Sequence, residues 1–299
     1  KMKKFLALFV VFLCLSLGVA SCNVTSVGGG GSDIIVASKG FTEQDILAEL
    51  LAQQIEATSD LKVDRRTLQG TKLCHEALVA GNIDSYIEYT GTALTAVLKK
   101  SVIDDPRKVY NSVKQAYEKE FNLEVTEPLG FENTYAVIVR GETAKEYNIK
   151  TVSDAVKYAS DWDIGIGYEF AEREDGLPGL IEAYNLQFKG RPKSMDLGLI
   201  YRALTQDLVD IVVNNSTDGQ IARLGLVILE DDKSYFPPYE AAPIVRKETL
   251  KKYPQLQKPL SQLSGILTAD EMQELNYQVE GELRKIKEVV TEFRQAKGL

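Results

Sequence analysis

Short apolar runs alternate with amphipathic segments along the first third of this 299-residue chain, and that alternation restricts the folds open to it. Runs typical of buried strands cover 34–37, 61–65 and 83–89. Two helices are predicted between them: one that Thr42 caps, and one over 71–80 that Gly81 closes. Strands and helices in this order predict a parallel sheet with helices packed on its faces.

The third of these strands runs directly into the start of a helix. Tyr89 stands at its end, where open α/β sheets bind their ligands, and Thr90, Gly91 and Thr92 form the turn. Unpaired backbone N–H groups at a helix start attract anions, whereas the face of an aromatic ring attracts cations. The stretch therefore predicts a platform for a small molecule with a cationic head and a carboxylate tail.

A second α/β pattern begins near residue 135, after a segment over 101–121 that is predicted to be mostly helical. Strands are expected over 135–139, 163–168, 209–214 and 227–230. Helices are expected over 176–184 and 196–204, together with one that Ser153 caps. The chain thus contains two α/β units, followed by a helical C-terminal part with a capping box at Thr268 and Glu271.

Two irregular segments rich in Pro and Gly, near 128–134 and 231–240, separate these units. We expect them to be crossovers between two lobes, of which the first comprises 33–132 and 238–299 and the second 133–237. A cleft between two lobes suits a protein that closes around a solute.

The N-terminus has the composition of an export signal over residues 1–21. Three lysines precede an apolar run that is too short to span a membrane, and small residues follow it. The sequence Val19-Ala20-Ser21-Cys22 resembles a bacterial lipobox, in which Cys22 carries the lipid. Ordinary cleavage after Ala20 is the alternative.

The segment 22–32 is small and polar and contains four consecutive glycines, which is typical of a flexible tether. Removal of the signal would leave Cys22 and Cys74, and lipidation of Cys22 would leave one thiol. A single thiol forms no internal disulfide, so packing has to stabilise the fold even in an oxidising compartment.

Several kinds of chemistry are excluded by what the sequence lacks. The net charge of −8, without a cluster of Lys and Arg, argues against binding to nucleic acid. His75 is the only histidine, which excludes a site built from several histidines, and we expect it to be exposed or to have a capping role. No phosphate-binding loop motif is present. The sequence therefore predicts no catalytic residues, no metal site and no cofactor.

Tyrosines dominate the chemistry that is present, with 14 in the chain against one Trp. Several stand at predicted strand ends or in loops, where each alone is more often rim packing than ligand contact: Tyr89, Tyr135, Tyr168, Tyr235 and Tyr239. Together with Lys39, Arg173 and the turn after Tyr89, they predict a polar cleft with aromatic walls. Lys, Arg and helix amides are suitable partners for a carboxylate.

Six motifs follow one another in the order known from one protein family. They are Ser38-Lys39-Gly40-Phe41-Thr42-Glu43-Gln44, Glu88-Tyr89-Thr90-Gly91-Thr92, Gly130-Phe131-Glu132-Asn133-Thr134-Tyr135, Arg173-Glu174-Asp175-Gly176, Ser216-Thr217-Asp218-Gly219 and Phe236-Pro237-Pro238-Tyr239. The chain resembles, over about residues 33–299, the glycine betaine/choline/carnitine substrate-binding proteins of osmoprotectant ABC importers. Six ordered motifs are far more specific than any one of them.

The resemblance implies an α/β, type II periplasmic-binding-protein fold that closes on a trimethylammonium ligand in a tyrosine cage. By motif, Tyr89, Tyr135 and Tyr239 resemble three walls of that cage. The residues that resemble partners of the ligand's carboxylate are Lys39, Thr92 and Arg173. Gln44 and Thr90 are similar to further pocket residues, and the position of Thr90 is thought to influence which head groups fit.

One position departs from the family pattern. A tyrosine, the fourth cage wall, usually precedes Ser-Thr-Asp-Gly, and this chain has Asn215 there. One missing ring weakens the binding of a betaine by roughly 1–2 kcal/mol, about ten- to thirtyfold. An amide at this place could instead bind a polar part of another ligand, and the resemblance extends to binders of ergothioneine.

The leading hypothesis is a lipid-anchored, extracytoplasmic receptor, monomeric, that delivers a small zwitterion to the permease subunits of an ABC importer. A second hypothesis is a surface lipoprotein that keeps the fold but acts as a sensor or adhesin, without adjacent permease and ATPase genes. An enzyme on a bilobed scaffold is the third, and it would consume its ligand.

Overall fold

The first three predicted strands are neighbours in one sheet of the computed structural model, which describes residues 31–173 and 175–299. β1 (Ile34–Ser38) lies between β2 (Val63–Thr67) and β3 (Ser85–Tyr89), and these three strands are parallel. The sheet continues with β10 (Ala241–Arg246) and β4 (Leu123–Val125). We call this sheet and the helices packed on it the first lobe.

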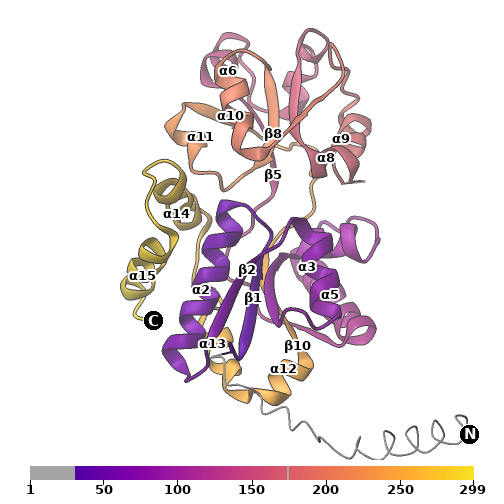
Figure 1. The fold of residues 1–299 in the computed structure, drawn as a ribbon. Helices are drawn as coiled ribbons and strands as arrows, with labels where there is room; N and C mark the ends of the chain where they lie inside the picture. Colours follow the sequence, from indigo (N-terminus) through magenta and orange to yellow (C-terminus); the bar gives the residue numbers. More distant parts are fainter. Residues whose placement is uncertain (1–30, 174) are drawn as a thin grey trace, which may run out of the picture. The chain divides into compact units, whose positions relative to one another are not determined.

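Alternate residues of these strands face two different layers of helices. Val36 and Ile87 pack toward α2 (Thr42–Thr58), whereas Tyr86 packs toward α3 (Gly70–Val79) and α5 (Pro106–Phe121) (Figure 1). Between α3 and α5, β3 continues directly into α4 (Thr90–Thr92) and the π-helical turn η1 (Ala93–Val97). Side chains that alternate along a strand in this way bury both faces of the sheet.

The second lobe is built on another five-stranded sheet. Its order is β7 (Lys193–Met195), β6 (Ile164–Gly167), β8 (Ile211–Asn215), β5 (Tyr135–Arg140) and β9 (Leu226–Leu229). Its helices are α6 (Gly141–Glu146), α7 (Val152–Ala155), η2 (Ala159–Asp161), α8 (Tyr168–Glu172), α9 (Leu177–Tyr184), α10 (Leu197–Thr205) and α11 (Gln220–Arg223).

Both sheets are mixed, so the expectation of a purely parallel sheet was incomplete. β10 is antiparallel to β3 and β4, and β5 is antiparallel to β8 and β9. β10 and β5 are the strands that the chain enters from the other lobe. A strand entering from the cleft side runs opposite to strands that end there, which accounts for the antiparallel pairs.

Two crossover segments connect the lobes, as the sequence predicted. The chain leaves the first sheet after β4 and enters the second at β5, and it returns between β9 and β10. The segments pair with each other: Glu132 and Glu240 form an antiparallel bridge, and the Asn133 N–H donates to the carbonyl of Tyr239 at 3.1 Å. The connection between the lobes is therefore a short two-stranded ribbon.

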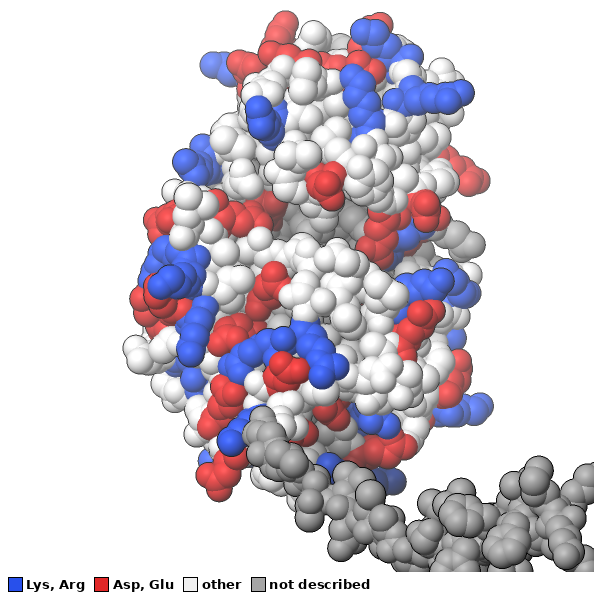
Figure 2. Space-filling view, viewed as in Figure 1, with Lys and Arg blue, Asp and Glu red and all other residues white. Residues whose placement is uncertain are grey.

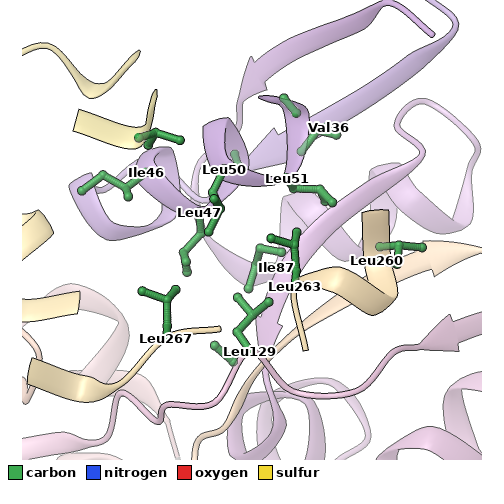
Figure 3. Close-up of a cluster of buried hydrophobic side chains, with 14 of the residues drawn as sticks. Val36, Ile46, Leu47, Leu50, Leu51, Ile87, Leu129, Leu260, Leu263 and Leu267 are labelled. Atoms are coloured by element: carbon green, nitrogen blue, oxygen red, sulfur yellow. The ribbon is translucent and has the colours of Figure 1, made fainter. Parts of the chain in front are cut away.

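The C-terminal helices pack on the first lobe. They are α12 (Lys247–Lys252), η3 (Pro254–Leu256), α13 (Gln257–Gln262), α14 (Ala269–Glu280) and α15 (Ile286–Ala296). Leu47 and Leu51 of α2 share one buried cluster with Leu260, Leu263 and Leu267 (Figure 3). The core of this lobe thus combines segments more than 200 residues apart.

The predicted helix caps were correct in one case and wrong in two others. The Thr268 capping box is present, but α2 has Phe41 at its N-cap instead of Thr42. Thr151, not Ser153, caps α7, because its side chain and Asp154 form the reciprocal pair.

The predicted helix over 101–121 begins only at Pro106, which Asp105 caps, since proline is favoured in the first turn of a helix. Helices in the described ranges 31–173 and 175–299 are too short or too polar to span a membrane. The predicted signal, the tether up to residue 30 and Cys22 lie outside the described residues.

Candidate functional site

A cleft of about 670 Å³ lies between the lobes, at the ends of strands from both sheets. β1 ends just before Lys39, β3 ends at Tyr89, and β8 ends at Asn215. Tyr135 begins β5 and is paired in register with Asn215, so these two residues form one wall. Strand ends are where α/β sheets commonly bind ligands.

Seven of the nine residues predicted to bind a ligand line this cleft: Lys39, Tyr89, Thr92, Tyr135, Arg173, Asn215 and Tyr239. Gln44 and Thr90 do not belong to the lining. Gln44 is fully buried in α2. The Thr90 hydroxyl is directed to the second crossover, where it lies 3.3 Å from the carbonyl oxygen of Pro238 and accepts the N–H of Glu240.

Three tyrosine rings from three segments line the cleft. The rings of Tyr135 and Tyr239 meet edge to face with centroids 5.8 Å apart. The Tyr239 hydroxyl donates to Asp175 at 2.7 Å, and the Tyr89 hydroxyl donates to Glu43 at 2.5 Å. Hydrogen bonds at the hydroxyl ends fix the directions in which these two rings present their faces.

Glycine at position 91 allows one of these rings to lie against the turn. A Cβ there would stand 2.7 Å from Tyr239 Cδ1 and 2.7 Å from the Pro238 oxygen, closer than packed atoms approach. The turn after β3 and the second crossover therefore touch through a position without a side chain.

Lys39 is buried and already paired. Its ammonium forms an ion pair with Glu88 and stands 4.9 Å from the centre of the Tyr89 ring. Glu88 also accepts the N–H of Tyr89 at 2.8 Å and the hydroxyl of Tyr86 at 3.1 Å. The charge of Lys39 is thus largely balanced within the protein, and one face of Tyr89 is occupied.

Arg173 is held by Asp175 in a two-pronged ion pair, with contacts of 2.8 Å from Nε and 2.5 Å from Nη2. Its remaining nitrogen, Nη1, lies 3.4 Å from the Thr92 hydroxyl and 3.5 Å from Glu169. Asp175 keeps the pKa of its carboxyl below the usual value despite burial, because Arg173, Thr95 and Tyr239 favour the charged form. Nη1 is therefore the nitrogen of this group available to an anion.

Glu43 is a functional candidate that the sequence reasoning missed. Its buried carboxylate accepts hydrogen bonds from the side chains of Tyr89, Asn133, Thr217 and Asn276. Burial raises the pKa of Glu43, and the four hydrogen bonds oppose that rise. Glu43 therefore joins the first lobe to the first crossover, to the second lobe and to α14.

The lining of the cleft is acidic on balance. Among the described lining residues, the acidic ones are Glu169, Asp196, Asp218 and Glu280, and the basic ones are Lys39 and Arg173. On the outer face in Figure 2, by contrast, Lys, Arg, Asp and Glu are interspersed over the described residues. The cleft is thus a locally negative environment on a surface of mixed charge.

Reactive groups outside the cleft have structural roles. His75 packs edge-on against Tyr117 and Phe121, with ring centroids 5.5 and 4.7 Å away, so the expected exposed or capping role was wrong. Burial raises the pKa of the Cys74 thiol to about 12, which leaves it protonated at neutral pH. The described part of the chain contains no group of three metal-ligating side chains placed to hold an ion.

Comparison with known proteins gives a consistent result. Residues 32–296 match the family described as the substrate binding domain of an ABC-type glycine betaine transport system. The carnitine transport binding protein OpuCC of Listeria monocytogenes is 39% identical over 98% of this chain and 96% of its own length. The ergothioneine transport permease/ergothioneine binding protein EgtU of Helicobacter pylori is 38% identical over 97% of this chain, matched to 52% of its own length.

Solved structures agree with the predicted fold. A glycine betaine/carnitine/choline ABC transporter structure superposes with a TM-score of 0.77 at 33% identity, covering 89% of this chain and 98% of that one. Lactococcal OpuAC in its closed form with glycine betaine has a TM-score of 0.59 at 12% identity, covering 89% of this chain and 96% of that one. These likenesses confirm the type II periplasmic-binding-protein fold.

Proposed function

Because the chain belongs to the family of substrate-binding domains of ABC-type glycine betaine transport systems, we propose that it binds a small quaternary-ammonium zwitterion by closure of its lobes. The ligand class is that of glycine betaine, choline and carnitine. The bound solute passes to the permease subunits of the importer, and the protein itself carries out no turnover.

The observation that carries this proposal is the meeting of Tyr89, Tyr135 and Tyr239 in one cleft. Each ring face attracts a trimethylammonium group by roughly 0.5–2 kcal/mol when both are desolvated. Burial raises the pKa of each of these phenols, so the rings stay neutral at physiological pH. Neutral rings with fixed faces support the binding of a cation that cannot donate hydrogen bonds.

The carboxylate end of the ligand is proposed to lie between Thr92 and Nη1 of Arg173. These groups are 3.4 Å apart, while the other nitrogens of Arg173 bind Asp175. Lys39, which Glu88 neutralises, contributes less to this end than the sequence suggested. Gln44 and Thr90, outside the lining, are proposed to support the pocket from behind.

The identity of the ligand depends on Asn215, which lies opposite Tyr135 where a fourth ring would stand. A betaine held by three rings binds more weakly than one held by four. The relative named for ergothioneine binding makes that larger betaine the second candidate. A surface sensor lipoprotein with the same fold is the candidate outside transport.

We further propose an extracytoplasmic location with an N-terminal lipid anchor. Residues 1–21 are the proposed signal peptide, Cys22 the lipidated residue and 22–32 the tether. The proposed lobes are 33–132 with 238–299, and 133–237, in a protein that is monomeric. Mass spectrometry of the membrane fraction would detect a diacylglyceryl group on Cys22, and an unmodified soluble form would contradict the anchor.

Calorimetry with glycine betaine, proline betaine, choline, carnitine and ergothioneine tests the ligand class. We expect heat from at least one of them, and other solutes binding in their place would refute the proposal. In the same series, Asn215→Tyr should tighten the simple betaines about ten- to thirtyfold, because it adds the fourth ring. Unchanged or weaker binding would place Asn215 outside the cage.

A further inference from the structure

Hydrogen-bond acceptors are concentrated on the wall of the cleft where β8 ends. Asn214 and Asn215 are the last residues of β8, and Asp218 follows in the turn before α11. All three line the cleft, as does Glu280 at the end of α14. These residues belong to β8, the turn after it and α14, whereas Thr92 belongs to α4 and Arg173 follows α8, so the two sets come from different segments of the chain.

Asn214 is the most informative of these residues because it is only 1% exposed. Its Nδ2 lies 3.5 Å from Oδ2 of Asp218, whereas its Oδ1 has no hydrogen-bond partner among the described residues. A buried amide oxygen without a donor is costly, and such atoms are rare in folded proteins. Asn214 is also one of the residues that line the cleft.

Asp218 adds negative charge beside that oxygen. Its Oδ1 accepts the N–H of Gln220 at 2.9 Å, and its Oδ2 lies next to Asn214. The buried hydroxyl of Tyr201 also stabilises the charged form of this carboxyl. Burial and the charge of Glu280 raise the pKa of Asp218 to about 7. A carboxyl group in this situation is stabilised in its charged form when a cation approaches.

The rest of the cleft provides no competing cation for this wall. Lys39 is paired with Glu88 and Arg173 with Asp175, both on other segments. The excess of acidic lining residues therefore has to be balanced by solvent ions or by the ligand.

We propose that Asn214, Asn215 and Asp218 form a second subsite, which accepts N–H groups from a positively charged nitrogen of the ligand. This nitrogen is additional to the quaternary head in the tyrosine rings, so the preferred ligand carries two nitrogen cations. The inference rests on the proposed function, since it assumes that the head group binds to Tyr89, Tyr135 and Tyr239. A purely structural role of Asp218, as the acceptor at the start of α11, is the competing explanation.

A pair of ligands matched in shape separates these explanations. Nα,Nα,Nα-trimethyl-lysine carries an ammonium group where the Nα,Nα,Nα-trimethyl derivative of 2-aminoheptanoic acid carries a methyl group. We expect calorimetry at pH 7.5 to show the lysine derivative binding roughly tenfold or more tightly, because hydrogen bonds between charged groups are strong. Equal affinities for the two ligands would overturn the second subsite and leave the proposed function intact. If neither of these ligands nor any other betaine bound, the proposed function itself would be overturned.

Asp218→Asn tests the residue itself. The substitution preserves an oxygen for the Gln220 N–H but removes the charge, so the preference for the lysine derivative should fall below about threefold. Glu172→Gln, which removes an exposed charge of the same lobe outside the cleft lining, should keep the full preference.

An equal loss of preference in both variants would show a general charge effect and would refute the subsite. Thermal unfolding of each variant checks that the fold is retained. If Asp218→Asn fails to fold, the wild-type comparison of the two ligands decides the question alone.

Discussion

Glu43 shows how a single carboxylate can organise both sides of a binding cleft. Two of its donors, Tyr89 and Asn133, belong to the first lobe and the first crossover, and Thr217 belongs to the second lobe. The fourth, Asn276, comes from α14. An acceptor-only group suits this place, because every neighbour is a donor.

Replacing Glu43 by Gln puts an amide N–H where only acceptors are accommodated. We expect Glu43→Gln to lower the free energy of unfolding by roughly 1–3 kcal/mol, because at least one buried donor loses its partner. Denaturant unfolding measures the change. Glu56→Gln on the same helix, which breaks a partly exposed pair with Arg65, should cost less than about 1 kcal/mol.

Equal losses in the two variants would contradict the role assigned to Glu43. The tyrosine at position 89 provides a second check, because its hydroxyl donates to Glu43. In Glu43→Gln the Tyr89 hydroxyl loses its carboxylate acceptor, so the affinity for a betaine should fall together with the free energy of unfolding.

Asp218 makes stability depend on pH in a defined direction. Its pKa is about 7 in the folded chain and close to 3.9 in an unfolded one. Between these values the folded state holds a proton that the unfolded state has released, so the free energy of unfolding falls as the pH rises through this window and levels off above it.

Unfolding curves of wild type and Asp218→Asn between pH 4.5 and 7.5 should therefore differ in slope. We expect wild type to lose on the order of 1–3 kcal/mol relative to the variant over this range. The contribution of Glu43, whose pKa is raised as well, cancels in the comparison. Parallel curves would show that Asp218 titrates normally.

At the scale of elements, the turn from β3 to α4 depends on a contact that is not local. Gly91 lies against Tyr239 of the second crossover, about 150 residues away along the chain. Because position 91 has no side chain, the ring of Tyr239 in the proposed cage can lie directly against the turn.

Gly91→Ala should push Tyr239 away from the turn and weaken betaine binding about tenfold or more, because the new Cβ would be 2.7 Å from the ring. Gly198→Ala is the matched control: this glycine is also in the cleft lining, on α10, and its Cβ would meet no atom within 4 Å. Calorimetry should find the control close to wild type. A similar loss in both variants would refute the packing argument.

Most of the strands that the sequence predicted have a continuous apolar pattern, although β2 is largely charged. β5 was predicted to within one residue, and β1, β8 and β9 to within two. β7 was not predicted, because Lys193 and Ser194 are exposed at a sheet edge and provide no apolar run. β10 was not predicted, because Pro243 interrupts its apolar pattern and proline is rare within sheets.

The residues of the candidate site were likewise predicted only in part. The tyrosines of the proposed cage were predicted from motifs, and they do line the cleft. Glu43 was not predicted as a site residue, since one of its hydrogen-bond donors, Asn276, is 233 residues away in sequence. The pairing of Lys39 with Glu88 likewise requires two strand ends to be adjacent, which no local pattern reveals.

At the scale of the whole body formed by residues 32–299, polar contacts join the lobes on both sides of the cleft. Thr95 of η1 lies 2.7 Å from Oδ2 of Asp175 and 3.2 Å from Nη2 of Arg173. On the other side, Thr217 and Asn276 meet Glu43. The proposed opening and closure of the lobes would therefore break and re-form these hydrogen bonds.

Thr95→Val keeps the shape of the side chain and removes its hydroxyl. We expect the ligand-free protein to have a larger radius of gyration by X-ray scattering and betaine affinity to fall about three- to tenfold, because closure loses a hydrogen bond. Thr58→Val, which removes a hydroxyl bonded to Gln54 within α2, should leave both quantities unchanged. An unchanged radius and affinity in Thr95→Val would show that this contact does not hold the lobes together.

The packing of α13, α14 and α15 on α2 sets the order in which the protein can be assembled. The second sheet is complete once the ribosome has passed β9, whereas the first sheet lacks its central antiparallel strand β10 until much later. Until the last helices emerge, the part of α2 that they cover is exposed and prone to aggregation. For the proposed export of the chain this delay is an advantage, because the first lobe completes its core only after its C-terminal helices have been made.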